Sequence, residues 1–279
     1  MNARIGGSLI IRNGNFYGYG WQQAIQSVLP LCDYFVILEA YSDRDNTYEE
    51  CLEIAAHDSR IEVIRGEWDG PEPEGYEFWR LSRLTNICLE RIIEAGMHYM
   101  LYVQGDEAWH EHGFDQIRRI VNGESRYGNA VKAIVQPFHH FVGNPHTTFP
   151  FVYSSSIRMA RTDTTWRADN DAWIMKCTDP ADNFQVIADK AYIYHYGKLG
   201  HPFKKLAKEH DFSLLFKSAG FPDPRVVRMI EEGKPLDYAY LFEETIKKGL
   251  FSPFEGTHPA AIKDWLDAHQ EWWQEFINE

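Results

Sequence analysis

The chain has 279 residues, and its 28 lysines and arginines against 41 aspartates and glutamates give a formal net charge of −13. This length suits one large α/β domain, or such a domain with a small helical appendage. An apolar content of 44% excludes a disordered chain. The acidic balance argues against binding to nucleic acid through bulk charge, because phosphates attract a basic surface.

Short apolar runs and scattered cysteines bear on where the protein resides. The run Leu9-Ile10-Ile11 is too short for a signal peptide, and Tyr34–Leu38 falls far short of a membrane span. The cysteines have no paired spacing that would indicate a zinc site or a disulfide framework; they are Cys32, Cys51, Cys88 and Cys177. We therefore expect a cytoplasmic protein that does not enter a membrane.

The first half of the chain alternates between strand and helix patterns. Compact β-branched or apolar runs predict strands, and apolar residues at helical spacing predict helices. The predicted elements are strand Ser8–Arg12, helix Trp21–Leu31, strand Tyr34–Leu38, helix Thr47–His57 with Thr47 as N-cap, strand Arg60–Arg65, helix Tyr76–Ala95 and strand His98–Val103. This order predicts an α/β fold with a mostly parallel sheet flanked by helices, which binds ligands at the carboxyl ends of its strands.

The second half is less regular and ends in helical patterns. The predicted elements are strand Ala130–Phe138, a loop at Gly143–Pro150, strand Phe151–Arg161, an irregular polar segment at Arg161–Asp182, strand Val186–Tyr194, and helices over 204–219, 224–232, 237–248 and 259–276. The sharpest change of pattern falls near His201. We therefore expect a catalytic α/β body over residues 1–200 and a helical C-terminal extension over 201–279 packed on it.

Carboxylates, rather than glycine-rich phosphate loops, follow the predicted strands. Neither Gly-x-Gly-x-x-Gly nor Gly-Lys-Ser/Thr occurs after the first strand. Instead, Glu39 and Asp45 follow the second strand and Asp106 follows the fourth. A nucleotide-sugar site needs an acidic group for the base or ribose, and a second one for a divalent metal that neutralises the diphosphate.

Several motifs resemble those of GT-A glycosyltransferases related to glycosyltransferase family two. Ser42 with Asp45-Asn46-Thr47 resembles the family's Ser-Thr-Asp-Gly-Thr turn, and residues 30–36 resemble its entry into the second strand. Arg83-Leu84-Thr85-Asn86 resembles its Ala-Arg-Asn stretch, and Gln104-Gly105-Asp106-Glu107 occupies the place of Asp-x-Asp. The resemblance covers residues 5–200 and implies a Rossmann-like GT-A fold. The chain departs from the family at Gln104, and Glu39 replaces a double aspartate.

The resemblance implies a role for each of several residues. Residues that would bind the donor are Arg12, Glu39, Asp45, Arg83, Gln104 and Lys198. Asp106 and His195 would hold a divalent metal, Mn²⁺ or Mg²⁺. An inverting transfer also needs a general base, for which the candidates are Asp163, Asp169, Asp171 and Asp179. Asp171 is preferred because Trp173 could stack on a sugar, and Asp169 is retained beside it; a retaining enzyme needs no such base.

Other groups of residues leave two interpretations open. Arg158 and Arg161 could hold a phosphorylated ligand or pair with nearby aspartates. His110, His112, His139, His140 and His146 could form a metal site, although His139 and His140 more plausibly fill the core or line an acceptor pocket. The basic face of Lys204, Lys205 and Lys208 is either solvated or contacts an anionic acceptor. The stripe of Trp265, Trp272 and Trp273 packs on the body or forms a homodimer.

The order of the motifs and the resemblance to GT-A glycosyltransferases imply a metal-assisted glycosyltransferase, a hexosyl- or pentosyltransferase, that uses a nucleoside-diphosphate sugar. The acceptor hydroxyl could belong to a saccharide, a lipid-linked glycan, a protein or a hydroxylated DNA base. Two other classes stay open. One is a nucleotide-sugar-binding protein that has lost catalysis, and the other is a nucleotidyltransferase or metallohydrolase on a similar sheet.

Overall fold

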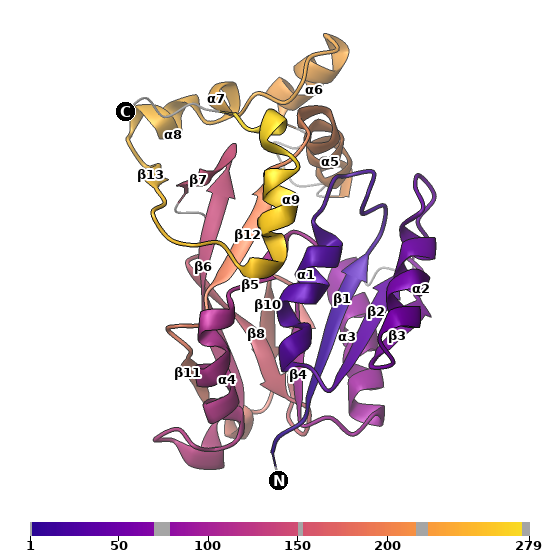
Figure 1. The fold of residues 1–279 in the computed structure, drawn as a ribbon, viewed down its shortest axis with the longest axis vertical. Coiled ribbons are helices and arrows are strands. Elements are labelled where there is room, and N and C mark those ends of the chain that lie inside the picture. Colours follow the sequence, from indigo (N-terminus) through magenta and orange to yellow (C-terminus); the bar gives the residue numbers. More distant parts are fainter. Residues whose placement is uncertain (1, 70–78, 150–152, 216–222, 275–279) are drawn as a thin grey trace.

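The computed structural model describes residues 2–69, 79–149, 153–215 and 223–274 (Figure 1). Its first half alternates strands and helices: β1 (Ile5–Ile11), α1 (Trp21–Val28), β2 (Tyr34–Glu39), α2 (Thr47–His57), β3 (Ile61–Arg65), α3 (Trp79–Glu94), β4 (Tyr99–Tyr102), β5 (Glu107–Trp109) and α4 (Phe114–Val121). Its second half contains β6 (Ala133–Val142), β7 (Asn144–Thr148), β8 (Ser155–Arg161), β9 (Trp166–Asp169), β10 (Ile174–Cys177), β11 (Gln185–Ile187), β12 (Ile193–Lys198), α5 (Pro202–Leu215), α6 (Pro224–Glu231), α7 (Tyr238–Leu241), α8 (Glu243–Lys247), β13 (Ser252–Pro253) and α9 (Lys263–Asp267).

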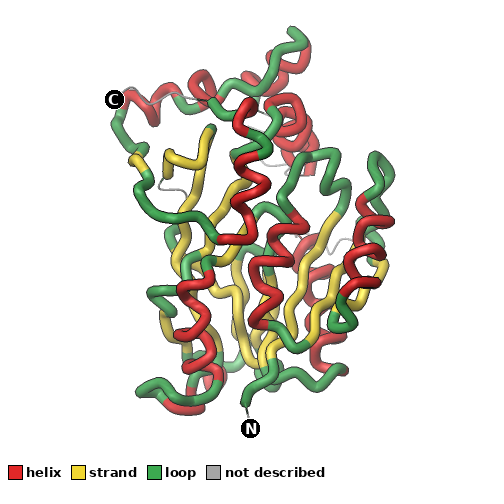
Figure 2. Tube along the Cα trace, viewed as in Figure 1, coloured by secondary structure: helices red, strands yellow, loops and turns green. Residues whose placement is uncertain are grey.

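The predicted α/β fold class is confirmed. One large sheet contains the path β13-β7-β6-β8-β4-β1-β2-β3, with β5, β11 and β12 attached beside it. The neighbours β4, β1, β2 and β3 are all parallel, as the alternating order of strands and helices requires. Antiparallel pairs enter only with the strands after β4, where β8 pairs with both β4 and β6. Figure 2 shows the strands of this sheet running side by side between helices.

Both faces of the central strands are buried, which explains their unbroken apolar runs. In β2, Phe35 and Ile37 pack with α1, whereas Val36 and Leu38 pack with α3 on the opposite face. Helix α4 lies on the same face as α1 (Figure 1). Each large apolar side chain buried in this way contributes about 1.5–3 kcal/mol relative to an exposed one.

The start of α2 differs in detail from the sequence-based prediction. Asn46, not Thr47, is the residue that precedes the first helical turn. The Thr47 hydroxyl instead accepts the backbone N–H of Gly14 at 2.9 Å, which ties the helix start to the loop after β1. The predicted first residues of the helix from Tyr76 lie outside the described residues, and the helix ends at Glu94 with Gly96 in the left-handed region, at φ 70°.

Three predictions in the second half are wrong. The expected loop at 143–150 contains β7, because Gly143 at φ 71° turns the chain back on β6. The segment 161–182 contains an antiparallel hairpin of β9 and β10. The single strand expected over 186–194 is two strands, β11 and β12, separated by a turn in which the N–H of Ala191 bonds to the carbonyl of Ala188.

The C-terminal extension is helical but more broken than its pattern predicts. The helix expected over 237–248 divides at Phe242, whose ring packs against Phe149 and Phe251. The helix expected over 259–276 is reduced to α9 with a 3₁₀ turn on either side. Ile262 and Leu266 are buried against β5 and β6, and Trp265 and Trp273 pack against the same cluster, so these two tryptophans of the stripe pack on the body as the first interpretation expected. A homodimer through these helices stays a prediction.

No helix among the described residues is long and apolar enough to cross a membrane.

Candidate functional site

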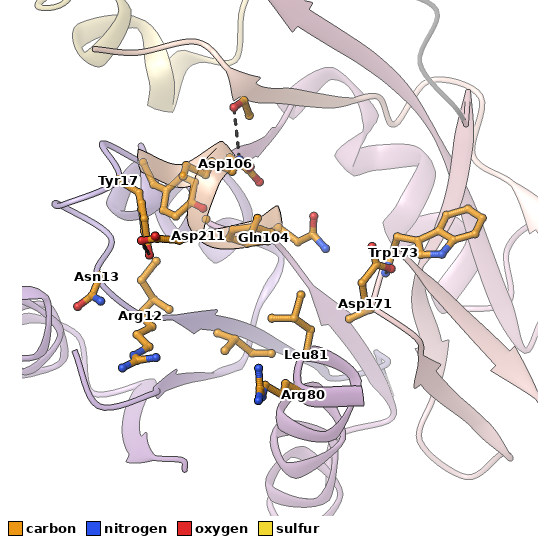
Figure 3. Close-up of a pocket in the computed structure, with 18 of the residues that line it drawn as sticks. Arg12, Asn13, Tyr17, Arg80, Leu81, Gln104, Asp106, Asp171, Trp173 and Asp211 are labelled. Carbon is orange, nitrogen blue, oxygen red and sulfur yellow. Dashed lines mark hydrogen bonds and ion pairs between the residues drawn. The ribbon is translucent and has the colours of Figure 1, made fainter. Parts of the chain in front are cut away.

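A cavity of about 800 Å³ opens at the carboxyl ends of β1 and β4. Its walls come from the loops that follow these strands, the start of α3, the turn between β9 and β10, the end of β12, and α5. Figure 3 shows Arg12, Asn13 and Tyr17 at one end, Asp171 and Trp173 at the other, and Asp106 with Gln104 between them. The cavity therefore has the position that the sheet topology predicts for a ligand site.

At the first end of the cavity, the loop after β1 is locked to the loop after β2. Asn13 adopts φ 53°, and its side-chain oxygen accepts the backbone N–H groups of Asp43 and Arg44 at 3.0 and 3.2 Å. Its own N–H bonds to the Ser42 hydroxyl at 2.8 Å. The Arg12 guanidinium lies 5.5 Å from the centre of the Trp68 ring. An aromatic ring and fixed polar groups suit a flat, hydrogen-bonding ligand such as a nucleoside.

Helix α5 of the C-terminal extension closes the same end of the cavity. The Tyr17 hydroxyl donates to Asp211 at 2.9 Å, and Arg44 forms a 2.6 Å ion pair with the same carboxylate. The Lys204 ammonium donates to the carbonyl of Asn15 at 2.7 Å. The extension is therefore part of the cavity wall as well as a covering for the body.

Asp106 lies at the middle of the cavity beside an ammonium group from α5. Lys208 Nζ is 2.9 Å from Asp106 Oδ2, and both side chains are nearly buried, at 11% and 13% exposure. Lys208 also donates to the carbonyl of Gly197 at 3.3 Å. Burial alone would raise the pKa of Asp106, but the charge of Lys208 and its hydrogen bond to the carboxylate outweigh burial and lower it. Asp106 is therefore a carboxylate at neutral pH.

His195 approaches the same carboxylate from β12. Its Nε2 is 3.6 Å from Asp106 Oδ2, and burial lowers the pKa of His195 to about 3, so the ring is neutral at pH 7. Gly197 follows two residues later. A Cβ at this position would lie 2.8 Å from both Asp106 Oδ2 and His195 Nε2, so only glycine leaves the space in front of both atoms open.

Glu107 points behind the cavity wall, opposite to Asp106. It forms a 2.7 Å ion pair with Arg158, and both side chains are fully buried. Glu107 also accepts the backbone N–H of Gln104 at 3.0 Å. Arg158 continues to the far wall, where its guanidinium donates to the carbonyl of Trp173 at 2.6 Å. This ion pair connects the turn that carries Asp106 with the turn that carries Asp171.

Asp171 lies on that far wall, between β9 and β10. The next residue, Ala172, adopts φ 58°, and its carbonyl accepts the Tyr102 hydroxyl at 2.7 Å. A non-glycine residue in this region is strained, and here contacts from three strands hold it in place. Asp171 accepts the N–H of Trp173 at 3.2 Å, and burial raises the pKa of Asp171 above its ordinary value. A raised pKa favours proton acceptance nearer to neutral pH.

With the preferred Asp171 and the retained Asp169 as candidate bases, ten residues were predicted for the site, and the structure brings six of them together. The cavity lining includes Arg12, Gln104, Asp106, Asp171, His195 and Lys198. The other four lie outside the lining. Two of them interact with neighbouring segments instead. Asp169 forms an ion pair with Lys176, and Arg83 donates a hydrogen bond to the carbonyl of Glu67.

The remaining two residues outside the lining serve the fold. Glu39 is fully buried, with Arg65 of the neighbouring strand 2.8 Å away and the N–H of Ser42 bonded to its other oxygen. Asp45 accepts the backbone N–H of Phe16 and that of Thr47. Both carboxylates therefore hold backbone segments together rather than facing the cavity.

Several other sequence-based interpretations are now distinguished. Arg161 pairs with Asp163, as the ion-pair interpretation expected, whereas the partner of Arg158 is Glu107 rather than a nearby aspartate. The ring of His139 stacks on Tyr192, 4.5 Å away, inside an aromatic cluster. No group of three or more metal-binding side chains occurs among the described residues, including the remaining histidines. Lys205 and Lys208 are buried rather than solvated, and Lys208 is paired with Asp106, a contact that sequence reasoning did not predict.

The charges of the described cavity lining balance. Five cationic side chains, Arg12, Arg44, Arg80, Lys198 and Lys208, face five carboxylates, Asp69, Asp106, Asp171, Glu209 and Asp211. Most of these charges form pairs, such as Lys198 with Glu209 at 2.5 Å. The lining by itself therefore offers no net positive charge to a diphosphate.

Asp106 and His195 fit a divalent cation. A carboxylate oxygen and an imidazole nitrogen converge on the space that Gly197 leaves open, and Mn²⁺ accepts both kinds of ligand. Asp106 can accept a hydrogen bond from the ammonium of Lys208 and still bind a metal ion, because a carboxylate has two oxygens with about four lone-pair positions.

No protein-family model matches the chain, and no curated protein matches its sequence. Solved structures that resemble it include S. aureus TarS in complex with UDP-GlcNAc, with 14% identity and a TM-score of 0.43 over 80% of this chain and 69% of that one. The TarS complex with UDP has 14% identity and a TM-score of 0.43, over 87% and 73%. A Desulfovibrio desulfuricans G20 protein described as a nucleotide-diphospho-sugar transferase has 9% identity and a TM-score of 0.37, over 82% and 95%.

These similarities concern the outline of the fold, an α/β sheet flanked by helices. The chemistry of the cavity therefore has to be derived from its own residues.

Proposed function

We propose that this protein is a glycosyltransferase that moves a sugar from a nucleoside-diphosphate sugar to an acceptor hydroxyl. The observation that carries the proposal is the order of groups along one cavity: an aromatic and hydrogen-bonding end, a central carboxylate with cations, and a carboxylate beside an aromatic ring (Figure 3). A nucleoside, a diphosphate and a sugar follow one another in the same order along the donor. Arg12, Trp68 and Tyr17 would surround the nucleoside.

The central part of the cavity would neutralise the diphosphate. The balanced lining supplies no net charge, so we propose that Asp106 and His195 would hold a divalent cation, Mn²⁺ or Mg²⁺. When bound, such an ion stabilises the negative charge that develops on the departing diphosphate. Lys208 and Lys198 lie beside this position and would donate hydrogen bonds to the same oxygens.

Asp171 would act as the general base of an inverting transfer. The acceptor hydroxyl would give its proton to the Asp171 carboxylate while its oxygen attacks the anomeric carbon, and the bond from that carbon to the diphosphate oxygen would break. Trp173 and Tyr153, whose ring centres are 5.2 Å apart, offer aromatic faces beside this carboxylate. Such faces pack against the apolar face of a sugar, so we propose a saccharide or another glycosylated acceptor.

A thermal-shift panel of UDP, GDP, CDP and TDP, each with Mn²⁺ and with EDTA, tests the proposal. A ligand raises the melting temperature of the state that it binds, so one nucleotide should stabilise the protein, and more strongly with Mn²⁺. If none of the four nucleotides changed the melting temperature, the proposed function would be overturned. Release of free sugar from the matching donor would then separate an active transferase from a protein that only binds nucleotide sugars.

A further inference from the structure

A chain of hydrogen bonds leads from the backbone to the proposed cation site. His140 Nε2 is 2.9 Å from the carbonyl oxygen of Tyr153, and His140 Nδ1 is 3.2 Å from His195 Nδ1. His195 Nε2, on the far side of its ring, is 3.6 Å from Asp106 Oδ2. His140 and His195 are register partners on the parallel strands β6 and β12, which places their side chains on the same face of the sheet.

The hydrogens of this chain follow from its first member. A carbonyl oxygen only accepts, so His140 Nε2 carries a hydrogen. In a neutral imidazole the second nitrogen is an acceptor, so His140 Nδ1 accepts, and the hydrogen between the rings belongs to His195 Nδ1. His195 Nε2 then has no hydrogen, and its lone pair faces a carboxylate. The lone pair of His195 Nε2 and the Asp106 carboxylate are therefore both available to a cation placed between them.

We propose that His140 is a positioning residue that holds His195 as its Nδ1–H tautomer, so that His195 Nε2 is presented as a metal ligand. This inference rests on the proposed function, since the cation at Asp106 is part of it. Histidine ligands of metals commonly donate their other N–H to a fixed acceptor, which sets both the tautomer and the orientation of the ring. Here that acceptor is a second imidazole, itself fixed by a backbone carbonyl.

The surroundings of His140 hold its ring in one orientation. The Phe138 ring stacks on it at 5.3 Å with an angle of 10°, and the Tyr153 ring meets it edge-on at 4.9 Å. His140 is only 5% exposed. An imidazole clamped in this way cannot rotate to exchange its nitrogens without disturbing two aromatic neighbours, so its acceptor nitrogen stays directed at His195.

Long-range ¹H–¹⁵N NMR on the metal-free, histidine-labelled protein tests the tautomer directly. The expected pattern has the hydrogen of His195 on Nδ1 and that of His140 on Nε2. A spectrum in which His195 carries its hydrogen on Nε2 would overturn the proposal whatever the enzyme activity.

Mn²⁺ affinity, followed by the loss of the free-ion EPR signal with and without saturating UDP, provides the second test. His140→Leu removes the acceptor, so Mn²⁺ affinity should fall about 10–100-fold. His140→Gln should bind Mn²⁺ nearly as the unaltered protein does, because its amide oxygen accepts from His195 and its amide N–H donates to the Tyr153 carbonyl. His139→Leu is the matched control: it removes the neighbouring imidazole, which stacks on Tyr192, and should leave Mn²⁺ affinity unchanged.

The outcomes separate this inference from the proposed function. Equal Mn²⁺ affinity of His140→Leu and the unaltered protein would overturn the positioning role alone. UDP binding with no Mn²⁺ binding under either condition would also overturn it, and would leave Lys208 as the resident cation of Asp106. Failure of every nucleotide in the thermal-shift panel would instead overturn the proposed function. Circular dichroism shows whether each variant is folded before it is compared.

Discussion

Two consecutive carboxylates, Asp106 and Glu107, form ion pairs on opposite sides of the cavity wall. The inner pair, Glu107 with Arg158, is fully buried and is joined by further hydrogen bonds to backbone groups on two walls. The outer pair, Asp106 with Lys208, borders the cavity and retains some exposure. One pair therefore stabilises the fold and the other forms part of the ligand cavity, and the direction in which each carboxylate points determines its role.

Breaking the inner pair should have the largest effect. Arg158→Met leaves Glu107 buried without a cation and removes the hydrogen bond to the carbonyl of Trp173, so the free energy of unfolding should fall by about 3–5 kcal/mol. Urea denaturation measures this change. The double variant Glu107→Gln with Arg158→Met should recover part of it, since no charge is then left unpaired. A loss in Arg158→Met below about 1 kcal/mol would show that Glu107 is not held as described.

Asp171 differs from Asp106 and Glu107, because it takes part in none of the ion pairs found among the described residues. Asp171→Asn keeps the oxygen that accepts from Trp173 but removes the base, so turnover should fall about 10²–10⁴-fold. The protein should still bind donor nucleotide. Turnover within a few-fold of the unaltered protein would move the general base elsewhere or indicate a retaining transfer.

The raised pKa of Asp171 adds a pH dependence with a defined sign. Burial raises the pKa of Asp171 in the folded protein above its value in the unfolded chain. The stability that the folded protein gains from a protonated Asp171 is therefore fully present below the unfolded-state pKa, and it is lost as the pH rises through the folded-state pKa. Asp171→Asn should therefore be more stable than the unaltered protein at pH 7, and this difference should disappear at acidic pH. As the pH is lowered, activity should begin to fall at a higher pH than it would if the base were an exposed aspartate. Melting temperatures and rates across pH 3–8 test both statements.

Breaking the outer pair should affect ligand binding more than the fold. Lys208→Met removes a charged donor beside the diphosphate position, a contact worth about 1.5–3 kcal/mol, so nucleotide affinity should fall about 10–100-fold. Mn²⁺ alone should stabilise this variant more than the unaltered protein, because Asp106 has lost its ammonium partner. Lys247→Met, an exposed helical lysine paired with Glu243, is the control. Equal nucleotide affinities for the two variants would exclude Lys208 from the site.

The smallest effect is expected at the contact between α5 and the loop after β1. Tyr17→Phe removes only the hydroxyl that donates to Asp211, so the free energy of unfolding should fall by about 1–2 kcal/mol. Nucleotide affinity should weaken slightly, since the loop loses one of its attachments. A nucleotide affinity lowered as strongly as in Lys208→Met would mean that the hydroxyl itself contacts the nucleotide.

Sequence reasoning recovered the elements whose periodicity is set by burial. Strand β2 was predicted because both of its faces are apolar, and α3 because one of its faces packs under the sheet. Strands β7 and β9 were missed because their residues are largely polar and pair as hairpins, so the partner strand stabilises them rather than their own composition.

The candidate site was recovered where a residue directly follows a central strand, as with Asp106, and was missed where partners are distant in sequence. Lys208 is 102 positions from Asp106, and only the docking of α5 brings them together. Glu39 also follows its strand, but it is the register partner of Arg65 on β3, and that pairing turns the carboxylate inward. The sequence shows neither the register nor the direction of the side chain.

The position of Lys208 on α5 has a consequence for how the molecule assembles during synthesis. The chain up to residue 200 supplies Asp106 and His195, but their ammonium neighbour follows only with the next helix. Until α5 docks, Asp106 is exposed to solvent on that side. A nascent chain would therefore synthesise the strands from β1 to β12 before the helix that completes its cavity, and the ligand-binding state would form only once α5 has docked.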